Sequence, residues 1–136
     1  MDVIQALLTA LPVFFAQFAV ALATLIIAVA VVLKATPAAE VRLIREGNLA
    51  AAIWAAGTTV AMAMPIGAAL RFSHTTTEVA VWAALAALIQ IAAYYAAAAL
   101  FGKTRASVEA GELPSAVAVV GVQLGVAFIN TAALSA

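Results

Sequence analysis

Apolar residues gather in long runs along this chain, and short polar stretches separate the runs. Three of the runs hold about 20 residues each without a formal charge, the length that a helix needs to cross a hydrocarbon core of about 30 Å. We expect these helices over roughly 49–70, 79–101 and 113–134. Together with an apolar run at the N-terminus, they predict an all-α membrane protein with four transmembrane helices.

The N-terminal run is longer than a bilayer requires. It extends from Val3 to Leu33 and would measure about 46 Å as one helix, against about 30 Å of hydrocarbon. Pro12 interrupts it, and proline removes a helical hydrogen bond. We therefore expect the crossing at roughly 13–33, with the residues before Pro12 in the interface or tilted out of the bundle.

Composition supports a lipid environment. The chain is 68% apolar and 9% charged, whereas a soluble domain is nearer half apolar and a quarter charged. A soluble fold of 136 residues has too little interior to hide so much apolar surface. The net charge is zero and no basic run occurs, so nucleic acid is not an expected partner. The absence of cysteine excludes disulfides and thiolate metal sites.

The polar connections predict an orientation. They cover roughly 34–47, 71–78 and 103–112, and the first contains a helix start at Thr36-Pro37 that favours a short interfacial helix. Five of the six lysines and arginines lie in the first and third connections. The excess of positive charge in cytoplasmic loops then places both of these connections in the cytoplasm and both termini in the periplasm.

The two halves of the chain resemble each other. Residues 47–70 align with 111–134, and glycines coincide at Gly57 and Gly121. Because both hairpins have the same predicted orientation, the fold is expected to be two tandem parallel two-helix repeats. The repeats cover about 13–70 and about 79–134 within a single integral membrane domain of residues 1–136.

The repeated small residues indicate close helix contact. Gly57 and Ala61 match Gly121 and Gly125, and each pair is a small-xxx-small motif. Such motifs let helix backbones approach in lipid, where the hydrophobic effect gives little drive. Packing within one chain is favoured over contact between subunits. The turns before the second and fourth spans are also repeated. In each turn a glycine permits the tight bend and a polar residue meets the free N–H groups at the helix start: Gly47 and Asn48, then Gly111 and Glu112.

Several polar side chains are predicted to meet at the middle of the membrane. Thr59, Gln90 and Gln123 fall near the midplane, and Asn130 shares a helix face with Gln123. Buried amides need partners, so hydrogen bonds between helices are favoured over the lining of a permeation path. The spans contain no ionisable Asp, Glu, Lys, Arg or His, which argues against a proton relay.

Candidate chemistry is otherwise scarce. No catalytic, cofactor-binding or metal-binding residues are predicted, because no nucleophile–base pair, ligand spacing or phosphate-binding loop occurs. Pro65 is expected to kink the second span. The aromatic residues lie nearer the span ends than the centre, which is typical of interfacial belts: Trp54, Trp82, Tyr94 and Tyr95.

Two segments carry a family resemblance. The stretch from Val41 to Ile53, and the later pattern Glu109-Ala110-Gly111-Glu112-Leu113 with Phe128-Ile129-Asn130-Thr131-Ala132, resemble the domain-of-unknown-function 350 family, also called the UPF0719 inner-membrane family. Pro114 and Ser115 stand where that pattern has alanines. The resemblance implies a small bacterial inner-membrane protein with duplicated two-helix units and brings no catalytic residues.

The sequence therefore favours a non-enzymatic inner-membrane protein that is a homo-oligomer or an accessory subunit of a membrane assembly. Its expected partners are the lipid bilayer and itself or another membrane protein, with no cofactor. The alternative is an oligomeric channel or pore for ions or small solutes, built around Gln90, Gln123 and Asn130. An intramembrane enzyme is the weakest hypothesis, because only a few charged residues at the cytoplasmic rim are candidates to converge: Arg45, Glu46, Glu109 and Glu112.

Overall fold

The computed structural model describes residues 2–33, 37–103 and 105–136, and every regular element in these ranges is a helix. The helices are α1 (Val3–Leu33), α2 (Pro37–Arg45), α3 (Leu49–Phe72), α4 (Thr76–Phe101), α5 (Arg105–Glu109) and α6 (Leu113–Leu134). Four of them, α1, α3, α4 and α6, are long and apolar enough to cross a membrane. The all-helical class and the presence of four helices of membrane-spanning length and hydropathy are thus confirmed.

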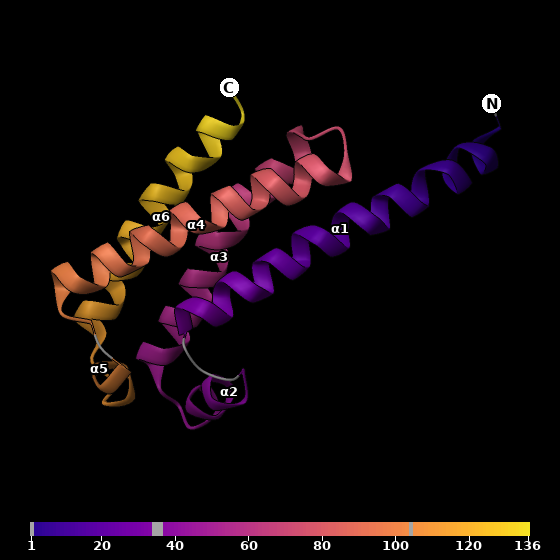
Figure 1. The fold of residues 1–136 in the computed structure, drawn as a ribbon. Coiled ribbons are helices and arrows are strands. Elements are labelled where there is room, and N and C mark those ends of the chain that lie inside the picture. The colour runs from indigo at the N-terminus through magenta and orange to yellow at the C-terminus, as the bar shows by residue number, and fades with distance from the viewer. Residues whose placement is uncertain (1, 34–36, 104) are drawn as a thin grey trace.

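The expectation of a crossing that begins near residue 13 stays a prediction, but Pro12 does not end the helix. Helix α1 is continuous over 31 residues and passes through Pro12 (Figure 1). A proline removes one hydrogen bond from a helix, and the apolar residues on both sides still favour helix in lipid, where the backbone has no water to bond to. Helix α3 likewise continues through Pro65. The short helix α5 was not predicted, whereas the short helix expected at Thr36-Pro37 is present as α2, and its interfacial position stays a prediction.

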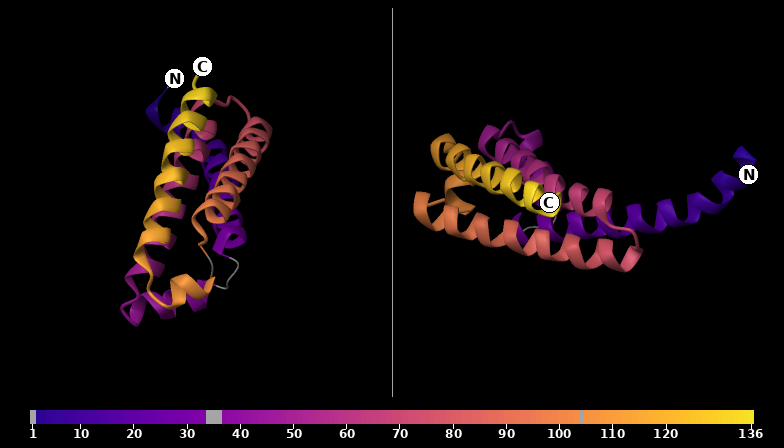
Figure 2. Two further views of the ribbon diagram at one scale, coloured as in Figure 1. Left: turned by 90° about the vertical axis from the view of Figure 1, so that its left-hand side faces the viewer. Right: turned by 90° about the horizontal axis from the view of Figure 1, so that it is seen from above.

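Helix α3 lies at the centre of the bundle. It packs most extensively on α6 and also contacts α1 and α4. Helix α4 lies between α6 and α1 and contacts both. The N-terminal half of α1 extends clear of the other helices (Figures 1 and 2).

The short helices α2 and α5 lie at one end of the bundle, and the α3–α4 turn and the C-terminus lie at the other (Figure 2). The two basic connections predicted from the sequence therefore share an end, although Lys34 and Thr36 lie outside the described residues. Helices α1 and α4 accordingly both run toward the end with α2 and α5, and α3 and α6 both run away from it. Their equivalence as tandem repeats stays a prediction.

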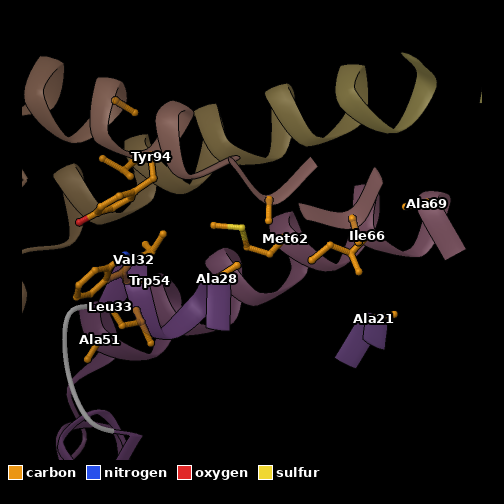
Figure 3. Packing of buried hydrophobic residues seen from close by; sticks show 14 of the residues in the cluster. Ala21, Ala28, Val32, Leu33, Ala51, Trp54, Met62, Ile66, Ala69 and Tyr94 are labelled. Carbon is orange, nitrogen blue, oxygen red and sulfur yellow. The ribbon is translucent and has the colours of Figure 1, made fainter. Parts of the chain in front are cut away.

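The core consists of many alanines and a few large side chains. Alanines of α1, α3 and α4 are buried along the helix contacts, and Met62 and Ile66 fill the centre (Figure 3). Trp54 and Tyr94 lie together toward the end where α1 stops at Leu33. The small side chains let the backbones approach, which gains dispersion contact between helices in lipid.

Candidate functional site

Three side chains of the predicted polar layer, Gln90, Gln123 and Asn130, are buried and joined by hydrogen bonds between helices. Gln90 and Gln123 are fully buried and Asn130 is 7% exposed. The Gln90 Nε2 donates to the backbone carbonyl of Gln123 at 3.1 Å. The Asn130 Nδ2 donates to the carbonyl of Ala86 at 3.1 Å and to Gln90 Oε1 at 3.3 Å. Helices α4 and α6 are therefore joined by donors from each of them, Gln90 on α4 and Asn130 on α6.

Thr58, and not Thr59, is the threonine of this layer. The Thr58 hydroxyl donates to Gln123 Oε1 at 3.2 Å and is fully buried. Thr59 lies on the outer face of α3, where its hydroxyl donates to the carbonyl of Ala55, one turn back. The difference arises because adjacent helical residues point about 100° apart, so membrane depth alone does not decide which one faces the bundle.

The layer links helices α3, α4 and α6 by hydrogen bonds. Most of its carbonyl and amide groups are paired inside a single chain, as polar groups in hydrocarbon require. One donor, the Gln123 Nε2, is buried without a hydrogen-bond partner. None of these amides is arranged to contact a solute that moves along the outside of the bundle.

The predicted small-residue pairs have different surroundings. Gly57 faces α6, and a Cβ at this position would overlap the side chain of Val120. Ala61 is fully buried one turn further along α3. Gly121 and Gly125 face outward on α6, with no other atom within 4 Å of where a Cβ would lie. Only the first pair therefore forms the close helix contact within this chain.

The two repeat turns also differ. Gly47 and Gly111 both adopt positive φ, 87° and 78°, which favours glycine. The Asn48 Oδ1 accepts from Ala51 N–H at 3.0 Å and caps α3, while its Nδ2 donates to the carbonyl of Val108 at 2.8 Å. Glu112 precedes α6 without a side-chain cap bond. Asn48 thus ties the first turn to α5 of the second half.

One buried lysine was not predicted from the sequence. Lys103 is 6% exposed, and its Nζ lies 3.1 Å from the centroid of the Trp54 ring and 3.2 Å from the Tyr94 hydroxyl. The two rings stack with centroids 6.1 Å apart. Gly102 adopts a left-handed conformation that ends α4 and turns the chain back, so Lys103 reaches over the rings.

The interfacial-belt prediction is consequently wrong for two aromatic residues. Trp54 and Tyr94 are 2% and 7% exposed and belong to the core, whereas Trp82 and Tyr95 lie on the surface. Aromatic faces attract cations, most strongly where water is excluded. No pattern in the sequence marks this site, because Trp54 and Tyr94 come from two different helices.

The charged residues that were candidates to converge at the rim are exposed. The pair Arg42 and Glu46 lies 3.9 Å apart on the surface, with both side chains well exposed. Arg45, Glu109 and Glu112 are exposed as well. Among the described residues, no group of three or more His, Asp or Glu side chains is placed to hold a metal ion.

Comparison with known proteins agrees with the resemblance seen in the sequence. No curated protein and no solved structure matches this chain. Residues 6–134, nearly the full length, match the family described as Domain of Unknown Function (DUF350). The helical membrane-type fold and this match together show that the chain belongs to the DUF350 family.

Proposed function

We propose that this chain is a non-enzymatic, multi-pass protein of the bacterial inner membrane that works as a homo-oligomer or as an accessory subunit of a membrane assembly. The N-terminal half of α1 is the observation that carries this proposal. No residue from Asp2 to Val20 is buried, and only Gln17 and Val20 are even partly covered. We call residues 3–20 the α1 arm.

The α1 arm carries large apolar side chains that the rest of the chain leaves uncovered. Val3 is 72% exposed, Leu8 67% and Phe15 60%. Helix α1 measures about 46 Å, about 16 Å more than the hydrocarbon core. Lipid covers an arm that lies within the core, but any part beyond it needs protein, because exposed apolar surface is costly in water. A second membrane protein chain, identical or different, meets that need.

The outer face of α6 offers a second surface for association. Gly121 and Gly125 leave the backbone open, and the neighbouring Phe128 and Ile129 are each 70% exposed. Small residues beside large ones on a lipid-facing helix favour close packing with another helix. The outer face of α6 is therefore a second candidate surface for association, beside the α1 arm.

Removing the aromatic side chains of the α1 arm should weaken association. Phe14 stacks on Phe18 with centroids 6.1 Å apart, and Phe15 packs edge-on against Phe14. Simultaneous Phe→Ala changes at these three positions should raise the dissociation constant at least tenfold. Light scattering in mild detergent and cross-linking in native membranes measure the effect. The control is Phe72→Ala with Phe101→Ala, which removes exposed rings from α3 and α4.

Two results contradict the proposal. A wild-type chain that is strictly monomeric in mild detergent and in membranes, and that captures no partner, removes the oligomeric or accessory role. Equal weakening by the arm variant and by the control variant removes the α1 arm as the surface responsible.

The proposed orientation places the end with α2 and α5 in the cytoplasm and both termini in the periplasm. Because the chain has no cysteine, single cysteines report location without background. A membrane-impermeant maleimide added to spheroplasts should label His74→Cys, in the α3–α4 turn, and should leave Ala110→Cys unlabelled until the cells are lysed. The reverse pattern would invert the topology.

The pore alternative has no comparable observation in its favour. Gln90, Gln123 and Asn130 make their hydrogen bonds within one chain and are buried there. A path between subunits would need polar groups on the outer surface of the bundle. Thr59 is polar and outward, but its hydroxyl is bonded to its own helix.

A further inference from the structure

The turns before α3 and α6 are built by the same backbone hydrogen bonds. In each turn a glycine N–H donates to the carbonyl three residues back, and the next N–H donates to the carbonyl five residues back, at 2.9 or 3.0 Å. The donors are Gly47 and Asn48 before α3, and Gly111 and Glu112 before α6. Residues 47–70 and 111–134 therefore start from the same local structure, and α3 and α6 can be compared residue by residue.

One face of α5 and α6 is buried where the second half packs on α3. Val120 lies against Gly57, and the Gln123 side chain accepts from the Thr58 hydroxyl. Five buried residues mark this face: Val108, Ala116, Val119, Val120 and Gln123. Their matches in the first half line a groove of about 540 Å³, and none of them is buried: Ile44, Ala52, Ala55, Ala56 and Thr59. This groove is thus an uncovered counterpart of the face that α6 presents to α3.

The small residues show the reverse arrangement. Gly57 of α3 lies so close to α6 that a Cβ would overlap Val120, and Ala61 one turn on is fully buried. Their matches on α6, Gly121 and Gly125, have no other atom within 4 Å of where a Cβ would lie. Helix α6 thus carries an uncovered counterpart of the face that α3 presents to α6.

We propose that α6 of one copy packs through Gly121 and Gly125 into the groove on α3 of a second copy, so that the contact between α3 and α6 within the chain is repeated between chains. This inference rests on the proposed homo-oligomer and names the two surfaces that meet. Both helices run away from the end with α2 and α5, so copies that share an orientation bring matching depths together. Because the two surfaces differ, the contact is heterologous and builds a ring or an open row.

The groove suits a helix with a small-residue face. Alanine is its commonest lining residue, and the Thr59 hydroxyl already donates to the carbonyl of Ala55 at 2.7 Å. An entering helix therefore leaves that hydroxyl with its partner. Small residues on both sides let the two backbones approach closely, which is the source of helix contact in lipid.

Charges at the rim are complementary in this arrangement. Within the chain, the Asn48 Nδ2 reaches across to α5 and donates to the carbonyl of Glu109 at 3.3 Å. The matching positions are Glu112 on one copy and Arg45 on the second copy. Both side chains are exposed and they carry opposite charges. The repeated contact therefore brings a carboxylate beside a guanidinium, which stabilises the same register as the helix packing.

Cysteine cross-linking in native membranes tests the proposal, because the chain has no cysteine of its own. Oxidation of a mixture of Gly121→Cys chains and Ala56→Cys chains should give dimers, whereas neither variant alone should. A chain that carries both substitutions should give a ladder of dimers, trimers and larger species. The control pairs Gly121→Cys with Ala92→Cys, an exposed position of α4 at a similar distance from the end with α2 and α5, and should give no dimer.

The outcomes separate this contact from the proposed function. Gly121→Cys chains that cross-link to one another as readily as to Ala56→Cys chains overturn the heterologous contact. Oligomers or complexes with another protein that form without the mixed cross-link also overturn it, and they leave the proposed function standing. A wild-type chain that is strictly monomeric and captures no partner removes both.

Charge reversal tests the contact without cysteines. Arg45→Glu and Glu112→Arg should each raise the dissociation constant about fivefold at low salt, since an exposed attraction becomes a repulsion, and the two together should restore it. Arg42→Glu reverses another exposed charge of α2 and should change the dissociation constant little. Equal weakening by Arg42→Glu and Arg45→Glu, or a double variant that associates no better than the single ones, overturns the contact.

Discussion

Replacing Gly57 by leucine is expected to lower the free energy of unfolding by about 3 kcal/mol, the upper part of the range for overpacked sites. Even a Cβ at this position would overlap both methyl groups of Val120 on α6. Valine is stiff at χ1 because it is β-branched, so Val120 cannot simply rotate away. Helices α3 and α6 would have to separate along the most extensive contact in the bundle. Unfolding by SDS in mixed micelles, followed by circular dichroism, measures the loss.

The matching glycine of the other half is the control. Gly121 aligns with Gly57 in the sequence, but its surroundings are open and it faces outward. Gly121→Leu should leave the free energy of unfolding of a monomer unchanged or raise it by up to about 1 kcal/mol, because glycine is a poor helix former. Equal losses for the two variants would mean that the aligned glycines are packed alike, in contradiction to this structure.

Much of the fold could be predicted from the sequence because the bilayer imposes simple rules. Apolar length alone located the helices later found as α3 and α6 to within two residues at each end. Apolar length also gave the extent of α1, which continues through Pro12 because a proline weakens a helix without ending it when no water competes for the backbone. The α4 start at Thr76 was missed, because Thr75 caps the helix by accepting from Glu78 N–H.

The sequence predicts how deep a polar side chain lies in the membrane, but not which way it points around its helix. Gln90 and Gln123 were placed correctly near one another because an amide in hydrocarbon requires a partner. The choice between Thr58 and Thr59 depends on helix rotation, which neighbours set and an alanine-rich helix hardly reveals. Helix α3 has apolar residues on all sides, so no polar stripe marks its outer face.

The burial of Lys103 could not be predicted from apolar length or from depth in the membrane. It follows the last apolar residues of α4 in a polar connection, where a lysine ordinarily extends into water or headgroups. The left-handed Gly102 redirects the chain, and the stacked rings of Trp54 and Tyr94 come from two different helices. That site required knowledge of how α3 and α4 pack.

Replacing Gln90 by leucine should lower the free energy of unfolding by about 1–3 kcal/mol, since it removes two buried hydrogen bonds between α4 and α6. Asn130 would keep only its bond to the carbonyl of Ala86. Unfolding by SDS measures this loss, and Thr59→Val, which removes an exposed hydroxyl bonded to its own helix, should change it little.

Gln123→Leu should cost less than Gln90→Leu, although both glutamines are fully buried. The backbone carbonyl of Gln123 remains to accept from Gln90, so the main link between α4 and α6 survives. The substitution also removes the Gln123 Nε2, a buried donor without a partner, and that removal offsets part of the lost bond from Thr58. A larger loss for Gln123→Leu than for Gln90→Leu would show that the Gln123 side chain holds more of the layer together than these bonds indicate. The Gln90 amide would then be the secondary link between the two helices.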